Sequence, residues 1–498
     1  MIVKTEKDII QSYFEDSSGL IGGYADKVVL PESIDDVIMA IKEANDNRIP
    51  VTVSGAGTGV TAARVPFGGI VLATDKLDKI LKIHERSGSD NTICVECGAR
   101  LEKIAKAVEA HKLMYPPDPT EQNAFIGGSI STNASGARTF KYGPTRNYVK
   151  ALTVVLADGE VLEMARGNNF ADENGVMKFR TRSGKEIKLK VPGYQMPRVK
   201  NAAGYFAKPK MDLIDLFIGH EGTLGVIVDC ELGLIEAVPD SFDCCVFFRE
   251  DASALDFVNE VKVISSKSRE GSFSDAIDAM SIEYLDNNSL KILSKKYTNM
   301  PGGAECAIFF EQAIKDNENL ILEKWKSLFD KYPLIEDIWF AQTRPDKEKF
   351  KTIRYDLPEM INEMVKNNKK PKVGTDIAVP HKNLNEMFLI YKSIFKKQDI
   401  PYAIFGHIGD SHLHANILPS TDADLQSARA LYTELVKKAI QLGGTVSAEH
   451  GIGKLKHKYL EMMYSKNSIM QMVQLKKTLD PNCILGLDNI FPKEYLLS

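Results

Sequence analysis

Three glycine-rich loops in the first half of the chain constrain its fold more than any other feature. They run from Gly55 to Gly59, from Gly127 to Gly136 and from Gly219 to Gly225. The first follows the short β-prone run Pro50–Ser54, and the third follows an apolar strand-like run. Glycine lets a backbone turn sharply and approach a ligand closely, and the exposed N–H groups of such loops bind pyrophosphate. The sequence therefore predicts a nucleotide-binding domain of mixed α/β type.

The pattern does not predict a plain Rossmann site. That fingerprint places Gly-x-Gly-x-x-Gly between a strand and a helix. Gly57, Gly59 and Ala62 fit it loosely, but the following run Val65–Gly69 contains proline and two glycines and would break a helix. The departure argues against a simple NAD domain. A single glycine loop often serves only to turn the chain, but three in one domain favour ligand binding.

A chain of 498 residues is too long for one core, so we expect two or three domains. Apolar runs such as Cys244–Phe248 and Ala307–Phe310 alternate with amphipathic helices near 252–265 and 314–331, which is typical of an antiparallel sheet covered by helices. The predicted fold class is α+β: a two-subdomain mixed α/β domain, an α+β domain and a helical C-terminal segment. The expected boundaries are a leader at 1–24, the glycine-loop domain at 25–237 with a turn-rich excursion at 167–209, the second domain at 238–422 and the C-terminal helices at 423–498.

Composition excludes several classes of protein. The net charge of −4 argues against a nucleic-acid-binding protein. The amino terminus has no apolar signal core and the chain has no run of about twenty apolar residues, so we expect a cytoplasmic protein without a transmembrane segment. Seven cysteines in so long a chain do not resemble a disulfide framework. Cys94 and Cys97 alternate across a strand-like run, so we expect a structural role and no iron–sulfur cluster.

The histidines point to chemistry rather than packing. Four of the nine lie in two short segments, Phe405–Asn416 and Ala448–Gly451. Two β-prone runs joined by a tight turn in the first segment predict a hairpin that would place His407 and His414 opposite one another. Glu449 would complete a set of two histidines and a carboxylate, which suits Zn²⁺, Mn²⁺ or Fe²⁺ without deciding between them. The alternative is that these histidines are structural.

Together these motifs resemble the FAD-linked oxidase family with the vanillyl-alcohol-oxidase-type (PCMH-type) flavin domain. Within that family the sequence is most similar to the branch of D-lactate dehydrogenase, the glycolate oxidase large subunit and D-2-hydroxyglutarate dehydrogenase. The motifs are specific jointly rather than singly, and they extend from about residue 28 to residue 490. They are Gly55–Gly59, Gly127–Gly136, Glu221–Gly225, His407–Asn416 and Glu449–Lys454. The resemblance implies an FAD-dependent oxidoreductase that acts on CH–OH groups.

The resemblance implies where FAD would bind. The pyrophosphate would lie against the first two loops, and no His or Cys occurs between Val51 and Val65, where some relatives attach the flavin through a histidine, so we expect non-covalent FAD. The residues expected near the phosphates and ring are Ser54, Gly55, Ala56, Gly57, Thr58, Gly59, Gly127, Gly128, Ser129, Ser131, Thr132, Asn133, Ser135 and Gly136. Those expected near the isoalloxazine or ribityl region are Pro117, Asp118 and Pro119, and those near the adenine are Glu221, Gly222, Val226 and Ile227.

The resemblance also implies roles at the histidines. His407, His414 and Glu449 would hold the metal, and Asn416 would bind substrate or orient a ligand. His450 would take the hydroxyl proton of a 2-hydroxy acid while the Cα hydrogen leaves as a hydride to flavin N5. This accords with simple chemistry, because a Lewis acid lowers the pKa of a hydroxyl and an imidazole removes its proton near neutrality.

A carboxylate substrate also needs a cation. Arg354 lies where relatives place an arginine for this purpose, and a guanidinium matches a carboxylate with two parallel hydrogen bonds; a surface salt bridge is the alternative. The 2-hydroxyglutarate enzymes add a threonine and a lysine, but here Pro358 has the threonine spacing and no lysine immediately precedes the Thr375-Asp376 pair. A monocarboxylate such as D-lactate or glycolate is therefore favoured, with Lys372 or Arg344 as alternative cations for a dicarboxylate.

Other functions stay open: a D-2-hydroxyglutarate dehydrogenase, a flavoenzyme like the alkyl-dihydroxyacetone-phosphate synthases, or an electron-transfer flavoprotein subunit. The histidine-rich motif of the synthases is not reproduced in Ser447–Gly451, and the complete histidine set disfavours a non-catalytic subunit. The expected partners are a small 2-hydroxy acid and an electron-acceptor protein, such as electron-transferring flavoprotein or a quinone-linked carrier. His412 stands where relatives commonly have asparagine, so it would be either a bystander or an extra ligand, and we favour the bystander.

Overall fold

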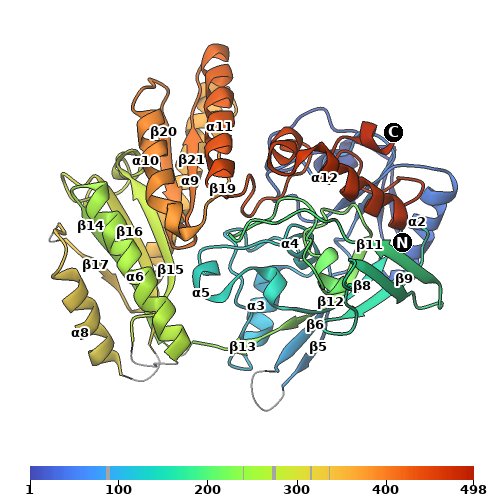
Figure 1. Cartoon of the computed structure of the whole chain (residues 1–498), viewed down its shortest axis with the longest axis horizontal. Coiled ribbons are helices and arrows are strands. Elements are labelled where there is room, and N and C mark those ends of the chain that lie inside the picture. Colours follow the sequence, from blue (N-terminus) through green and yellow to red (C-terminus); the bar gives the residue numbers. More distant parts are fainter. Residues whose placement is uncertain (86–89, 239, 272–275, 315–316, 336, 498) are drawn as a thin grey trace.

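Two lobes, each built on its own sheets, make up the chain (Figure 1). This computed structural model describes residues 1–85, 90–238, 240–271, 276–314, 317–335 and 337–497. The N-terminal lobe contains the glycine loops, and the second lobe contains the histidine hairpin. The predicted fold class, a mixed α/β domain followed by an antiparallel α+β domain, is confirmed. Among the helices in these ranges, none combines the length and the apolar character needed to cross a membrane.

The first sheet of the N-terminal lobe positions the first glycine loop. Its strand order is β1 (Ile2–Lys4), β2 (Lys27–Leu30), β4 (Ile70–Ala73), β3 (Val51–Ser54). Strands β2, β4 and β3 are parallel, and α2 (Ile34–Asp46) connects β2 to β3. Ser33 caps α2 by accepting a hydrogen bond from the Asp36 N–H. Because β3 ends at Ser54, the loop begins at the carboxyl edge of a parallel sheet, which is where such sheets bind ligands.

The second sheet is antiparallel and carries the other two loops. Its order is β5 (Ile80–His84), β6 (Thr92–Glu96), β12 (Val226–Gly233), β8 (Val149–Val155), β9 (Val161–Ala165). The segment between β6 and β8 contains α3 (Leu101–Glu109), β7 (Leu113–Met114), α4 (Ile126–Ser131) and α5 (Thr139–Tyr142), and β7 pairs with β13 (Ile235–Glu236). The second glycine loop forms α4 and its exit, and the third leads directly into β12. Residues of all three loops line one cleft.

The second lobe has one large antiparallel sheet. Its order is β17 (Trp339–Ala341), β14 (Asp240–Phe248), β16 (Cys306–Ile314), β15 (Ala279–Asp286), β20 (Tyr402–Gly406), β21 (His412–Ile417), β18 (Val373–Gly374), and β19 (Ile377–Ala378) also pairs with β21. Helices α6 (Asp251–Gly271), α8 (Glu318–Phe329) and α10 (Leu384–Phe395) share one core with one face of the sheet, whereas α7 (Asn287–Ser294) and α9 (Arg344–Asn368) share another core with the opposite face. Burial on both faces explains why β14 and β16 read as continuous apolar runs.

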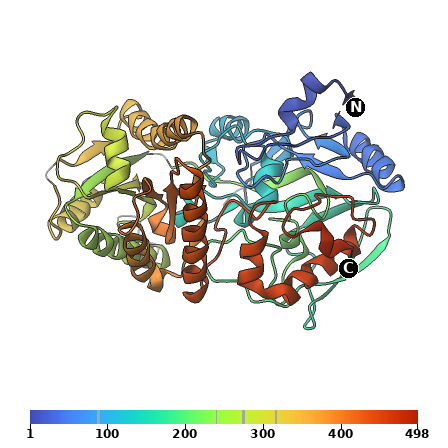
Figure 2. The same ribbon diagram turned by 90° about the horizontal axis from the view of Figure 1, so that it is seen from above.

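The C-terminal part of the chain divides between the lobes. Helix α11 (Asp422–Gln441) packs on α10 in the second lobe, whereas α12 (His457–Leu479) lies against the N-terminal lobe (Figure 2). The Val51 N–H donates to the Ile484 carbonyl over 2.7 Å, and the Gly486 N–H donates to the Val51 carbonyl over 2.9 Å. The sequence-based boundary at residue 423 therefore does not mark a separate unit. The crossing segment between α11 and α12 carries Glu449 and His450 across the junction of the lobes.

The turn-rich excursion at 167–209 contains a hairpin, formed by β10 (Val176–Arg180) and β11 (Glu186–Lys190). After β11 the chain runs without regular structure toward the lobe junction. There the Ala202 N–H donates to the Ser447 carbonyl over 2.9 Å. The excursion thus reaches the same crossing segment that carries Glu449 and His450.

Candidate active site

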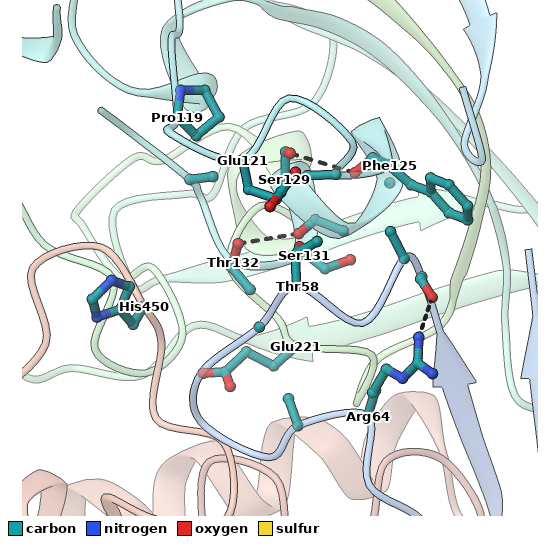
Figure 3. Close-up of a pocket in the computed structure, with 18 of the residues that line it drawn as sticks. Thr58, Arg64, Pro119, Glu121, Phe125, Ser129, Ser131, Thr132, Glu221 and His450 are labelled. Atoms are coloured by element: carbon teal, nitrogen blue, oxygen red, sulfur yellow. Dashed lines mark hydrogen bonds between the residues drawn. The ribbon is translucent and has the colours of Figure 1, made fainter. Parts of the chain in front are cut away.

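A deep cleft lies where the three glycine loops meet, and it extends to the histidines of the second lobe (Figure 3). It encloses about 1560 Å³, counting its open mouth. The expected cofactor residues that line it are Gly55, Ala56, Gly57, Thr58, Gly59, Pro119, Gly127, Gly128, Ser129, Ser131, Thr132, Ser135, Gly136, Glu221, Gly222 and Ile227. His407, Glu449 and His450 line its far end. One continuous space therefore joins the glycine loops to the histidine cluster.

Five expected cofactor residues are absent from the lining: Ser54, Pro117, Asp118, Asn133 and Val226. The Ser54 hydroxyl is fully buried and donates to the neighbouring Gly55 carbonyl. Asn133 accepts from the Arg146 N–H over 3.0 Å, and Asp118 accepts from the Gln122 side-chain amide over 3.0 Å. These polar side chains hold the loops in shape, which the sequence pattern could not distinguish from binding a ligand.

Glycines of the second loop are needed at their positions for different structural reasons. A Cβ built on Gly136 would lie 1.9 Å from the Asp118 carbonyl oxygen, and one on Gly127 would lie 2.8 Å from the Cys97 Cβ. Both positions therefore require glycine for packing of the protein itself. A Cβ on Gly128 would meet nothing within 4 Å, although Gly128 lines the cleft. The open space over Gly128 is the kind that a closely approaching ligand requires.

Two charged side chains brace the cleft. Arg64 donates to the Gly55 carbonyl over 2.7 Å and to the Ser12 carbonyl over 2.6 Å, so it holds the first loop (Figure 3). Glu221, expected near the adenine, accepts hydrogen bonds from the N–H groups of Ile452 and Gly453 over 2.8 and 2.6 Å. Burial raises the pKa of Glu221 to about 7, against the opposing effect of these two N–H groups. The carboxyl group of Glu221 thus anchors the crossing segment to the cleft.

The histidine hairpin forms as predicted, but its register differs. Phe405, not His407, pairs with His414 across β20 and β21. His407 lies one residue beyond β20, before a 3₁₀ turn at Ile408–Asp410 that ends with Ser411 in the left-handed region at φ 56°. This connection is longer than the predicted tight turn, and it brings His407 and His414 together without placing them opposite one another.

The structure brings the three expected metal ligands together and adds a fourth candidate. The Glu449 Oε1 atom lies 3.5 Å from His407 Nε2 and 3.2 Å from His414 Nε2. His412, expected to be a bystander, has its Nδ1 4.0 Å from Glu449 Oε2. One donor atom from each of these four residues lies within 4.8 Å of every other. Imidazole nitrogens and a carboxylate converging in this way form a chemically suitable site for a transition-metal ion.

Acceptors around the cluster hold the outer nitrogens of its histidines. His407 Nδ1 lies 2.7 Å from Glu283 Oε1, and His414 Nδ1 lies 3.0 Å from the Thr375 carbonyl oxygen. Such acceptors fix the tautomer and the orientation of the rings. The inner nitrogens are therefore directed toward Glu449.

Lys200 and Asp376 place strong charges beside the cluster. Lys200 Nζ lies 2.7 Å from Glu449 Oε2, and Ser135 of the second glycine loop donates to the same oxygen over 3.1 Å. Burial alone would raise the pKa of Glu449, but the Lys200 ammonium and His407 lower it well below its usual range. Burial would likewise raise the pKa of Asp376, but His450 and Lys456 lower it well below its usual range. Both carboxylates are therefore ionised.

His450 stands between the cleft and the cluster. It lines the cleft (Figure 3), and its Nε2 lies 3.5 Å from Glu449 Oε1. Its Nδ1 lies 3.3 Å from Asp376 Oδ2. The Asp376 carboxylate is itself held by Ser447 Oγ over 2.7 Å and by Lys456 Nζ over 2.8 Å. An imidazole oriented by a fixed carboxylate on one side, with its other nitrogen facing a cleft, is arranged to accept a proton.

Arg354 and Asn416 lie on the margin of this cluster. Arg354 projects from α9, and its Nη2 lies 3.7 Å from Glu283 Oε2, the carboxylate that also holds His407. Asn416 follows His414 by two residues on β21 and is buried, and its Nδ2 has no hydrogen-bond partner among the described residues. Both side chains have N–H groups that could donate hydrogen bonds to a bound carboxylate.

Sequence reasoning missed Lys200, Glu283 and the orienting role of Asp376. Asp376 was visible only as part of a Thr-Asp pair after β18. Lys200 lies near the end of an excursion whose purpose the pattern did not indicate, and Glu283 lies in the middle of a fully buried strand, β15. The signal that could have identified Glu283 is a charged residue within a strand that is buried along its whole length, because such residues are rarely buried without a partner.

Comparison with known protein families agrees with this geometry. Residues 25–165 match the family model of the FAD binding domain, and residues 249–487 match that of the FAD linked oxidases, C-terminal domain. The chain belongs to the FAD-linked oxidase family. It is accordingly an FAD-dependent oxidoreductase, and the cleft along the glycine loops is suited to FAD because Gly128 leaves open the close approach that a pyrophosphate needs.

Several members of the family cover nearly the whole chain. Glycolate oxidase subunit GlcD of Bacillus subtilis (strain 168) is 28% identical over 497 residues, covering 97% of this chain and 92% of the relative. D-2-hydroxyglutarate dehydrogenase of Stutzerimonas stutzeri (strain A1501) is 28% identical, covering 98% and 96%. D-lactate dehydrogenase of Archaeoglobus fulgidus is also 28% identical, covering 94% and 91%. An alkyldihydroxyacetonephosphate synthase structure superposes with a TM-score of 0.65 at 18% identity, over 97% of this chain and 81% of that one, which shows a shared fold.

Proposed function

We propose that this FAD-linked oxidase is a dehydrogenase that oxidises a D-2-hydroxy acid, with D-lactate or glycolate favoured, to the 2-oxo acid, and that it requires a divalent metal ion. Three relatives that align with nearly the whole chain carry glycolate, D-lactate or D-2-hydroxyglutarate in their names. The observation that carries the proposal is the position of His450, which lines the FAD cleft while its Nε2 lies 3.5 Å from Glu449. A substrate bound there would touch both halves of the site.

His450 is the proposed base. Its Nε2 accepts the hydroxyl proton of the substrate, while Asp376, 3.3 Å from Nδ1, keeps the ring in the required tautomer and stabilises the imidazolium that forms. When bound, FAD supplies a two-electron acceptor and the divalent ion supplies a Lewis acid. His407, His414 and Glu449 are the residues proposed to hold that ion.

The carboxylate of the substrate is proposed to bind Arg354 and Asn416. The guanidinium presents a planar fork of donors, and the Asn416 Nδ2 has no other partner among the described residues. A preference for a monocarboxylate is supported by two observations. Pro358, one helical turn after Arg354 in α9, has no donor, and Lys372 Nζ lies 3.3 Å from Asn362 Oδ1.

The flavin linkage, the cellular compartment and the electron acceptor are further parts of the proposal. We expect FAD to be non-covalent, so acid precipitation should release it. All seven cysteines are free, which is compatible with a reducing cytoplasm. Electrons then pass to an acceptor protein, either electron-transferring flavoprotein or a quinone-linked carrier. Reduction of each purified acceptor by the substrate-loaded enzyme would distinguish them.

A screen of D- and L-2-hydroxy acids with a dye acceptor, with metal analysis of the same sample, tests the proposal. D-lactate or glycolate should be oxidised, and His450→Asn should abolish oxidation while flavin absorbance is retained. Preference for D-2-hydroxyglutarate would correct the substrate but keep the reaction. Oxidation that persists in His450→Asn at the original rate would remove His450 from the reaction.

A further inference from the structure

His412 enters the metal cluster from the same strand as His414. It is the first residue of β21, two positions before His414, so the two side chains lie on one face of the strand. Their ring centroids are 4.3 Å apart, and that of His407 lies 5.5 Å from His412. His412 is 0% exposed, so its ring is fully removed from water. Its position is therefore as interior as any donor of the cluster.

The two nitrogens of His412 have different surroundings. Nε2 lies 3.1 Å from Asp376 Oδ1, away from the direction of a good hydrogen bond. Nδ1 has no hydrogen-bond partner among the described residues and lies 4.0 Å from Glu449 Oε2. Leaving a buried polar atom without a partner costs about 1–3 kcal/mol. Such an atom, directed at a cluster of metal-binding side chains, indicates a ligand that occupies the space between them.

His412 also repeats the arrangement of the other two histidines. In His407 and His414 one nitrogen faces an acceptor, Glu283 or the Thr375 carbonyl, and the other faces Glu449. In His412 the Asp376 carboxylate lies behind the outer nitrogen Nε2 at 3.1 Å, and the inner nitrogen is Nδ1. A carboxylate or carbonyl behind an imidazole is the usual outer partner of a metal-bound histidine.

The distances fit a single ion. Two donors that bind one ion at about 2.0–2.2 Å lie at most about 4.4 Å apart. Glu449 Oε1 lies 3.2 and 3.5 Å from the inner nitrogens of His414 and His407, and Glu449 Oε2 lies 4.0 Å from that of His412. The four donor atoms lie within 4.8 Å of one another, so shifts of a few tenths of an ångström would bring all of them to one centre.

We propose that His412 is a fourth protein ligand, so that the metal of this enzyme is held by three imidazoles and one carboxylate. The inference rests on the proposed function, because it concerns the same metal. A nitrogen-rich set favours Zn²⁺, Fe²⁺ or Co²⁺ over Mg²⁺ and Ca²⁺. On a six-coordinate ion, four protein donors leave two positions, which is the number that the hydroxyl and carboxylate oxygens of a chelating 2-hydroxy acid would use.

The test compares metal binding by the FAD-loaded protein and its His412→Asn variant. Zn²⁺ affinity is measured by competition with a chromophoric chelator, and X-ray absorption of the Zn²⁺-loaded protein counts the imidazoles. His407→Asn removes an expected ligand, and His381→Asn is the matched control, since His381 is exposed and outside the cluster. Flavin absorbance and circular dichroism report folding. The imidazole count of the unaltered protein tests the inference even where a variant fails to fold.

We expect three imidazoles in the unaltered protein and two in His412→Asn, with at least a tenfold loss of Zn²⁺ affinity and no change for His381→Asn. Two imidazoles in the unaltered protein, with unchanged affinity in His412→Asn and a loss only in His407→Asn, would overturn the fourth ligand and leave the proposed metal site intact. Equal Zn²⁺ binding by the unaltered protein and the three variants would refute the proposed metal site itself, and the inference with it.

Discussion

Gly127 and Gly128 are neighbours in α4, and replacing each of them by alanine should have opposite effects on stability. Gly128 has open space above it and an ordinary helical backbone, so alanine at this position gains helix propensity worth about 1 kcal/mol in the FAD-free protein. At Gly127 the added Cβ would lie 2.8 Å from the Cys97 Cβ and 3.0 Å from the Cys97 carbonyl oxygen. Such overpacking costs about 1–3 kcal/mol.

The effect on FAD affinity should run the other way for Gly128→Ala. The methyl group would occupy cleft space next to the backbone, where the pyrophosphate is expected to approach. Loss of one hydrogen bond to a charged group costs about 1.5–3 kcal/mol, which corresponds to roughly a 10- to 150-fold higher Kd for FAD. The FAD-free Gly128→Ala protein should therefore melt slightly above the unaltered protein and bind FAD at least tenfold more weakly.

Differential scanning fluorimetry of the FAD-free proteins and titration by quenching of flavin fluorescence would measure the two quantities separately. Gly127→Ala is the matched control, because it should lower the melting temperature of the FAD-free protein. If Gly128→Ala binds FAD as tightly as the unaltered protein, the pyrophosphate does not approach this backbone. If it lowers the FAD-free melting temperature as much as Gly127→Ala does, the space above Gly128 is not open.

Three further predictions concern charge and metal. Burial lowers the pKa of His220 to about 3. Below the ordinary pKa of 6.5 the unfolded chain therefore takes up a proton that the folded chain does not, and the free energy of unfolding falls by roughly 2 kcal/mol at pH 5. His220→Gln should reduce the drop in melting temperature between pH 7.5 and pH 5. Arg354→Lys should raise KM for the 2-hydroxy acid at least tenfold, since an ammonium lacks the planar fork, and an unchanged KM would assign the carboxylate to another cation. Dialysis against a chelator should abolish turnover while flavin absorbance remains, and Zn²⁺ or Mn²⁺ should restore it; full activity without metal would contradict the metal requirement.

The local features of the site were predictable from sequence because they depend on short-range chemistry. The glycine loops, the hairpin with His407 and His414, and the antiparallel sheet of the second lobe each follow from patterns a few residues long. The register of the hairpin was wrong by two residues, because a 3₁₀ turn at Ile408–Asp410 replaced the tight turn that the pattern favoured.

The supporting residues were not predictable because they come from distant parts of the chain. Lys200 reaches Glu449 from the end of an excursion in the other lobe, and Glu283 comes from a buried strand. The family pattern, which has asparagine at this position, favoured a bystander role for His412, and the proposal of a fourth ligand depends instead on its burial beside Asp376 and Glu449. No local pattern encodes such pairings; they are set by tertiary packing.

The return of the C-terminal segment to the first lobe affects how the protein is made. On the ribosome, residues 25–165 emerge early and contain two of the glycine loops, yet Val51 lacks its Ile484 and Gly486 partners until nearly the whole chain has been synthesised. Glu221 must also wait for the N–H groups of Ile452 and Gly453. The nascent first lobe therefore stays unfinished throughout translation of the second, and the cleft is completed only after Glu449 and His450 have been synthesised.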